Sequence, residues 1–208
     1  IDSVEPIYGL VALGLVHPDH VLTNRAARAG DALILTKPLG VGVYSAAFKQ
    51  GRLEEAGYAA LIDSTTRLNT VGAALAGRPG VHAVTDVTGF GLLGHALEMA
   101  RGSGVAVEID AASVPLLPGV DTLAREGVRT GASGRNWDGY GAAVTLPDGF
   151  DDWRRDLLTD PQTSGGLLIA VAEDQAEGVL ALARAQGFAA AARVGRVVAG
   201  PAGLRVTG

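Results

Sequence analysis

A short apolar run at residues 81–84 leads directly into the segment Asp86–Gly91, which has the sequence DVTGFG and is followed by an amphipathic stretch. An apolar run, an acidic residue, a glycine-rich turn and a helical pattern, in this order, predict a strand, a loop and a helix. The loop would place the Asp86 carboxylate beside backbone N–H groups and the positive end of the helix dipole. Such a loop can hold a divalent cation next to phosphate oxygens, so this segment indicates nucleotide or phosphoryl chemistry.

A second polar turn, Asp160–Gly166, has the sequence DPQTSGG and precedes an apolar run typical of a buried strand. We expect it to line the same cleft as Asp86, with Asp160 binding a substrate or a metal-bound water. The other candidate side chains in this turn are those of Thr163 and Ser164. The alternative is that Asp-Pro only initiates a turn here.

A third motif, Thr36–Gly40 (TKPLG), ends one strand and opens a helix. The strand should stop at Pro38, because proline cannot donate a hydrogen bond to a neighbouring strand. Lys37 could pair with a phosphate as a point charge. The alternative is a lysine that is solvated at a turn.

Taken together, the three motifs closely resemble those of the selenophosphate synthetase (selenide, water dikinase) family, in compatible order and spacing from Ile1 to about Val198. The resemblance implies an α/β (mixed α+β) fold, a layered sandwich of helices and sheet like the C-terminal domain of the aminoimidazole ribonucleotide synthetase-like superfamily. It also implies an ATP-dependent enzyme that makes selenophosphate from selenide and water, with AMP and phosphate as the other products. The family carries its nucleophilic Cys or selenocysteine and its catalytic Lys in an N-terminal tail and domain, so this chain alone is expected to be inactive and to supply no catalytic residue.

The resemblance divides the chain into residues 1–27, a remnant strand of the N-terminal ATP-binding domain with a linker, and residues 28–208, the C-terminal synthetase domain. It implies that Mg²⁺ is the metal cofactor and that ATP is a substrate beside selenide. It also implies that ATP and Mg²⁺ bind between this domain and the missing N-terminal domain, in a homodimer. Asp86 matches a Mg²⁺ ligand whose partner acids lie in that domain. Without the resemblance, Asp86 could equally cap the following helix.

The residues around Asp86 are expected to shape a loop whose N–H groups face an anion, because glycine permits positive φ and close backbone approach. These residues are Thr85, Thr88, Gly89 and Gly91. The alternative is a tight turn without a ligand. Arg135 lies in a GRNW segment that resembles the same family and could contact a phosphate bidentately or make a structural contact. His95 is expected to be a packed or surface histidine.

Composition argues against several classes of protein and of binding site. The chain has no Cys among 208 residues, which excludes disulfides and thiolate metal sites within it. Its net charge of -5, with acids and bases interspersed, argues against nucleic-acid binding. No apolar run approaches the roughly 20 residues of a membrane span, and we expect a cytoplasmic protein.

Apolar periodicity along the chain predicts alternating strands and helices, which pack as helix layers on a sheet. Residues 7–16 are expected to form a buried strand and residues 54–76 one long helix. Residues 110–141 are expected to form a long connection with one short helix near 120–126, followed by a strand at 142–146.

Two alternatives to selenophosphate synthesis stay open. One is another enzyme of the same superfamily, such as thiamine-monophosphate kinase, the hydrogenase-maturation dehydratase or a purine-pathway synthetase, although these lack the DPQTSGG turn. The other is a non-catalytic partner-binding module. Serine hydrolase and P-loop classes are set aside, because the chain has neither a Gly-x-Ser-x-Gly elbow nor a Walker A pattern.

Overall fold

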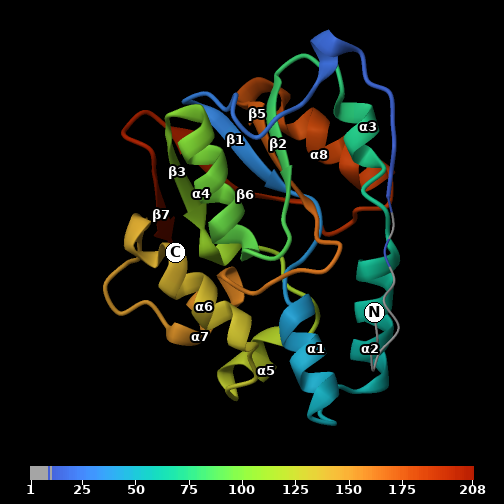
Figure 1. Ribbon diagram of the computed structural model, residues 1–208, viewed down its shortest axis with the longest axis vertical. Helices are drawn as coiled ribbons and strands as arrows, with labels where there is room; N and C mark the ends of the chain where they lie inside the picture. Colours follow the sequence, from blue (N-terminus) through green and yellow to red (C-terminus); the bar gives the residue numbers. More distant parts are fainter. Residues whose placement is uncertain (1–8, 10) are drawn as a thin grey trace, which may run out of the picture.

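A mixed sheet forms the centre of the computed structural model, which describes residue 9 and residues 11–208. The strands follow the order β2-β5-β1-β6-β3-β7-β4 (Figure 1). Neighbours from β2 to β3 pair antiparallel, whereas β7 runs parallel to both β3 and β4. The strands are β1 (Asp31–Leu35), β2 (Val81–Asp86), β3 (Ala106–Asp110), β4 (Val144–Thr145), β5 (Leu167–Ala172), β6 (Ala192–Val198) and β7 (Gly203–Thr207).

Alternating side chains of the central strand β1 supply two separate cores. Leu33 and Leu35 face the helix α4 (Gly91–Ser103), while Ala32 and Ile34 face α3 (Val71–Leu75) and α8 (Ala176–Ala185). Both pairs are fully buried, as expected for a strand covered on its two faces. The expected layered α/β sandwich is therefore confirmed.

A third core lies between helices at one end of the sheet, in the lower half of Figure 1. Fully buried Tyr44 and Val120 lie in this cluster. The helices of this end are α1 (Val41–Lys49), α2 (Glu55–Thr66), α5 (Val120–Arg125), α6 (Gly131–Tyr140) and α7 (Asp152–Leu158). Short 3₁₀ turns occur at Pro18–His20, Ala111–Ser113, Gly141–Ala143 and Glu173–Gln175.

The prediction of one long helix over residues 54–76 is wrong. The chain leaves the helical conformation at Arg67, where ψ is 113°, and α3 begins only at Val71. The Lys37 ammonium donates to the carbonyl oxygens of Ser64 and Arg67, and the Asn69 amide donates to the Gly165 carbonyl. Contacts with distant residues therefore end α2 where the local apolar pattern continues.

The expected long connection at 110–141 also needs correction, because it contains α6 as well as α5. The Thr130 hydroxyl caps α6 by accepting from the Ser133 N–H at 3.2 Å. Three glycines weaken the helical signal of α6, so the helix depends on packing of Trp137 and Tyr140 against the core that contains α4. The strand expected at 142–146 is reduced to the two residues of β4, because a 3₁₀ turn occupies Gly141–Ala143.

The buried strand expected at residues 7–16 is not found where the chain is described. Residues 7, 8 and 10 lie outside the described residues, whereas residues 9 and 11–16 form no strand. Val11, Leu13 and Leu15 are almost fully exposed. A strand needs a hydrogen-bonded neighbour, and none of the sheet's described strands pairs with this segment. Over the part of the chain that the structure describes, no helix is both long and apolar enough to cross a membrane.

Candidate functional site

The two most informative motifs, far apart in the sequence, lie against each other. Strand β2 ends at Asp86 opposite Leu167 of β5, so each motif extends from one of two paired strands. The Val87 N–H donates to the Gly166 carbonyl at 2.8 Å, and the Gln162 N–H donates to the Thr88 carbonyl at 3.0 Å. The DPQTSGG turn and the DVTGFG loop are therefore joined by backbone hydrogen bonds.

Asp86 is exposed at the carboxyl end of β2, at the start of the loop that leads into α4. The Thr85 side chain is half-buried, and its hydroxyl lies 3.4 Å from the Asp86 carbonyl oxygen. Gly91 has φ of 70°, and a Cβ there would lie 2.6 Å from the carbonyl carbon of Thr159. Gly89 has open space and no positive φ. The turn therefore requires glycine at 91 for the reason expected, but not at 89.

Helix α6 holds the loop from the other side through Asn136. Its side-chain amide donates to the carbonyl oxygens of Gly89 at 2.9 Å and Thr159 at 3.0 Å, which ties the loop to the residue immediately before the DPQTSGG turn. The Tyr140 hydroxyl donates to the Phe90 carbonyl at 2.6 Å. Sequence reasoning selected Arg135 from this segment, and Arg135 is exposed on α6. It missed the neighbouring Asn136, which makes the contacts with the loop.

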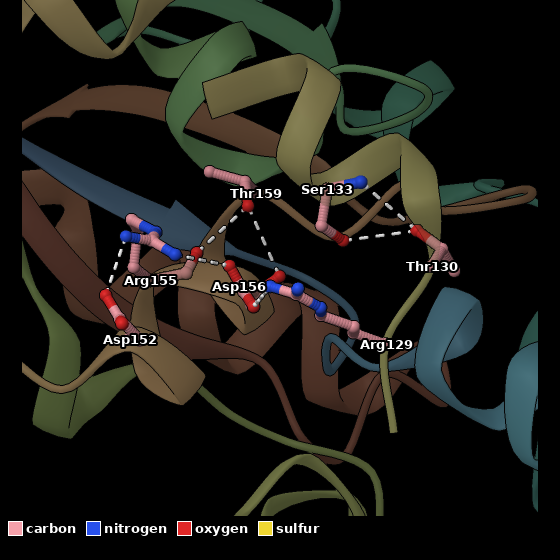
Figure 2. A network of polar contacts seen from close by, with 7 residues as sticks. All are labelled: Arg129, Thr130, Ser133, Asp152, Arg155, Asp156 and Thr159. Atoms are coloured by element: carbon pink, nitrogen blue, oxygen red, sulfur yellow. Dashed lines mark hydrogen bonds and ion pairs between the residues drawn. The ribbon is translucent and has the colours of Figure 1, made fainter. Parts of the chain in front are cut away.

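An ion-pair network anchors the end of α7, immediately before the DPQTSGG turn (Figure 2). Asp156 is buried and accepts from Arg129 at 2.9 Å and from Arg155 at 3.0 Å, and the two guanidinium groups approach it from opposite sides. The Thr159 hydroxyl donates to the Arg155 carbonyl at 3.0 Å. This network fixes the direction in which the chain enters the turn at Asp160.

Asp160 is fully buried and caps helix α1 rather than facing an open surface. Its Oδ2 accepts from the N–H groups of Gly42 at 2.9 Å and Val43 at 3.3 Å, and its Oδ1 has no hydrogen-bond partner in the structure. Gln162 caps the two preceding N–H groups of the same helix through Oε1. Burial raises the pKa of Asp160 to about 7, although hydrogen bonds from Gln162 and α1 lower it.

This raised pKa predicts a specific pH dependence of stability. The Asp160 carboxyl takes up a proton more readily in the folded than in the unfolded chain, so it stabilises the fold at low pH. That contribution is lost between about pH 4 and 7, at roughly 1 kcal/mol per pH unit. In urea unfolding from pH 4 to 8, Asp160→Asn should remove this decline from the free energy of unfolding. The same substitution at exposed Asp148 should leave the profile unchanged; an unchanged profile for Asp160→Asn would contradict the prediction.

Lys37 is buried, contrary to both readings of the sequence. Its ammonium donates to three carbonyl oxygens, those of Ser64 at 3.0 Å, Arg67 at 2.6 Å and Ser164 at 2.6 Å. Burial lowers the pKa of Lys37, and the nearby Arg67 lowers it further. Its three N–H donors are used, so in this structure Lys37 ties α2 to the DPQTSGG turn instead of offering a charge to a phosphate.

The tip of the DPQTSGG turn carries the remaining two candidates. Thr163 is exposed, and Ser164 is half-buried with φ of 50°. A positive φ in a non-glycine residue is uncommon, and here the hydrogen bond from Lys37 to the Ser164 carbonyl helps to hold it. The turn tip is thus held in a defined conformation beside the Asp86 loop.

His95, which the sequence predicts to be a packed or surface histidine, also contacts the Asp86 loop. It is buried near the start of α4, and its Nε2 lies 3.2 Å from the Thr88 hydroxyl. Its Nδ1 lies 3.0 Å from Glu98 Oε2. The spacing of three residues between His95 and Glu98 on a predicted helix was a usable signal for this pair.

A metal site built by this chain alone would need several ligating side chains close together. Among them, no group of three or more His, Cys, Asp or Glu side chains is placed to hold an ion. Mg²⁺ commonly uses one or two carboxylates, with waters and substrate phosphates completing its shell. The exposed carboxylate of Asp86 has the donor chemistry of a single Mg²⁺ ligand, and the described residues place no further pair of carboxylate or histidine ligands beside it to complete a protein site.

Residues 28–206 match the family described as AIR synthase related protein, C-terminal domain. The chain belongs to this family. It is 59% identical over 206 residues to selenide, water dikinase of Burkholderia orbicola, covering 99% of this chain and 58% of the relative. It is 54% identical over 206 residues to the protein of the same name from Rhizobium meliloti, covering 99% of this chain and 59% of the relative. The chain thus spans less than two thirds of the length of these relatives.

Two solved structures with the same fold illustrate it at lower sequence identity. The hydrogenase maturation protein HypE of E. coli superposes with a TM-score of 0.67 at 25% identity, covering 90% of this chain and 49% of HypE. Thiamine-monophosphate kinase from Stenotrophomonas maltophilia gives a TM-score of 0.66 at 25% identity, covering 93% of this chain and 55% of the kinase. Both support the layered fold described above.

Proposed function

We propose that this chain is the C-terminal domain of a selenide, water dikinase, an enzyme that uses ATP and water to make selenophosphate from selenide, with AMP and phosphate released. The observation that carries the proposal is the identity of 54–59% across nearly the whole chain to proteins of that name. The hydrogen-bonded junction of the DVTGFG loop and the DPQTSGG turn supports it, because it brings together two of the three motifs that carried the resemblance.

In this proposal, Asp86 is one ligand of Mg²⁺, and ATP binds beside the Asp86 loop in a cleft that a second domain would complete. A bound Mg²⁺ would neutralise charge on the phosphate oxygens, which is most of what phosphoryl transfer requires from its surroundings. Asn136, Gly91 and the DPQTSGG turn hold the loop so that the carboxylate stays at the end of β2. Thr85, Thr163, Ser164 and Arg135 remain proposed cleft residues.

The rest of the site is proposed to come from an N-terminal domain, within the part of the relatives' length that this chain does not span. The carboxylates and the nucleophile that this chain lacks would be supplied there, and residues 1–27 would belong to that domain and its linker. We further propose a homodimer that acts in the cytoplasm. The metal ligand would lie on one domain and the nucleotide contacts on the other. The reaction would therefore require the two domains to close on each other.

The relatives favour this function over the other superfamily activities. Thiamine-monophosphate kinase and HypE match at 25% identity, less than half the identity to the selenide, water dikinases. A non-catalytic binding module would have no use for an exposed carboxylate at the end of β2 beside the DPQTSGG turn.

The function can be tested by ³¹P NMR on the full-length protein incubated with ATP, Mg²⁺ and selenide under reducing conditions. A selenophosphate resonance is expected together with AMP and phosphate. Without selenide, no selenophosphate should form, and AMP and phosphate should accumulate more slowly. In a parallel incubation with thiamine monophosphate in place of selenide, steady phosphorylation of that substrate, together with no selenophosphate in the first, would favour the kinase activity instead. No turnover of ATP in a folded protein would favour the binding module.

A further inference from the structure

Three side chains form a hydrogen-bonded series that begins in the Asp86 loop and ends at the surface. The Thr88 hydroxyl contacts His95 Nε2 at 3.2 Å, and His95 Nδ1 contacts Glu98 Oε2 at 3.0 Å. The imidazole is buried between a half-buried hydroxyl and a carboxylate that is 46% exposed. The Phe90 ring packs against it at a tilt of 46° with centroids 5.6 Å apart, which helps to fix its orientation.

The chemistry of the three groups decides which atom donates in each contact. A carboxylate only accepts hydrogen bonds, so Nδ1 of His95 must carry a proton to bind Glu98. A neutral imidazole has a single N–H, so its Nε2 is then an acceptor. Beside a neutral His95 that carries its proton on Nδ1, the Thr88 hydroxyl donates its hydrogen to Nε2, and only its lone pairs remain for a ligand.

We propose that His95 and Glu98 are positioning residues that commit the Thr88 hydroxyl to accepting hydrogen bonds from the water shell of a divalent cation bound at Asp86. The inference rests on the proposed role of Asp86 as a metal ligand. A phosphate oxygen also only accepts, so it gains nothing from a hydroxyl whose hydrogen is already used. A water held by a cation is a strong donor and fits the same lone pairs. The pair thus selects a hydrated cation, rather than a bare phosphate oxygen, at Thr88.

The same contacts would also exist if His95 merely filled space beneath Phe90. The two roles differ in their coupling to Thr88. A positioning role requires that the effect of His95 on cation binding pass through the Thr88 hydroxyl, whereas a packing role affects stability with no such dependence. A double-mutant cycle separates them, because residues that act through one another are not additive.

The experiment measures Mn²⁺ binding to the full-length protein by electron paramagnetic resonance, with a non-hydrolysable ATP analogue present. His95→Phe and Thr88→Val should each weaken Mn²⁺ binding about 10-fold, within the range seen for residues that orient metal sites. The double variant should bind no more weakly than Thr88→Val alone. His95→Gln, whose side-chain oxygen can accept from Thr88, should recover most of the loss. His82→Gln, at a half-buried histidine on β2 paired with Asp31, is the matched control and should bind Mn²⁺ as the wild type does.

A second readout tests the tautomer directly. In ¹⁵N NMR spectra, His95 Nε2 should resonate as an unprotonated imidazole nitrogen, and a protonated Nε2 would overturn the inference. So would wild-type Mn²⁺ affinity in His95→Phe, or losses that multiply in the double variant. If Asp86→Asn lowers Mn²⁺ affinity and His95→Phe does not, the positioning role is wrong while the proposed function stands. If Asp86→Asn leaves the affinity unchanged, the metal site and this inference both fail.

Discussion

Replacing Asp86 by asparagine in the full-length protein is expected to lower the rate of selenophosphate formation by about 100-fold or more, the range seen when a charge-stabilising group is removed from an active site. Asparagine keeps the size of the side chain but removes the negative charge that a divalent cation needs. The residue is exposed at the end of β2, so the folded structure should not depend on it. Selenophosphate measured by ³¹P NMR, with urea unfolding in parallel, should show lost activity at unchanged stability.

Asp110 offers a matched control for this substitution. It also ends a strand, β3, and its carboxylate accepts from the Ala112 N–H at 3.1 Å as a local cap. Asp110→Asn should cost at most about 1 kcal/mol of stability and leave the rate close to that of the wild type. Near-normal turnover in Asp86→Asn would contradict the proposed metal site.

Adding one methyl group at Gly165 is expected to damage stability and activity together. A Cβ at this position would lie 1.9 Å from the carbonyl oxygen of Val87, which is far inside van der Waals contact. The oxygen belongs to backbone, so the clash can be relieved only by moving the two motifs apart. Gly165→Ala should therefore lower the free energy of unfolding by about 3 kcal/mol or more. It should also reduce selenophosphate formation, because the Asp86 loop loses its support.

Gly139→Ala provides the comparison for that variant. Gly139 lies on α6, where a Cβ meets nothing within 4 Å. Alanine there should leave activity unchanged and raise stability by about 0.5–1 kcal/mol, because alanine favours a helix more than glycine does. If Gly165→Ala unfolds at the same urea concentration as the wild type, the close packing of the two motifs is not what holds the loop.

Local patterns in the sequence predict most of this architecture and the position of Asp86. The apolar run before Asp86 and the glycine at 91 are short-range signals, and both act in the structure as expected. What local patterns could not supply is the pairing of β2 with β5, which brings residues 86 and 167 together. The joined site depends on that long-range pairing.

The residues whose surroundings were predicted wrongly are all held by contacts with residues that are distant in the sequence. Lys37 is buried because three carbonyl groups from distant segments surround its ammonium, and none of them is near it in the sequence. The break after α2 has the same cause. Asp160 caps α1 across a separation of more than 100 residues. By contrast, the pair of His95 and Glu98 is local and was open to detection from helical spacing.

The most direct test of the account is calorimetric titration of Mg²⁺·ATP into the 208-residue chain and, separately, into the full-length protein. Tight binding is expected for the full-length protein and no measurable binding for the chain alone, because Asp86 would be one contributor to a site shared with another domain. Tight binding by the chain alone would contradict this, since the nucleotide site would then lie within these residues.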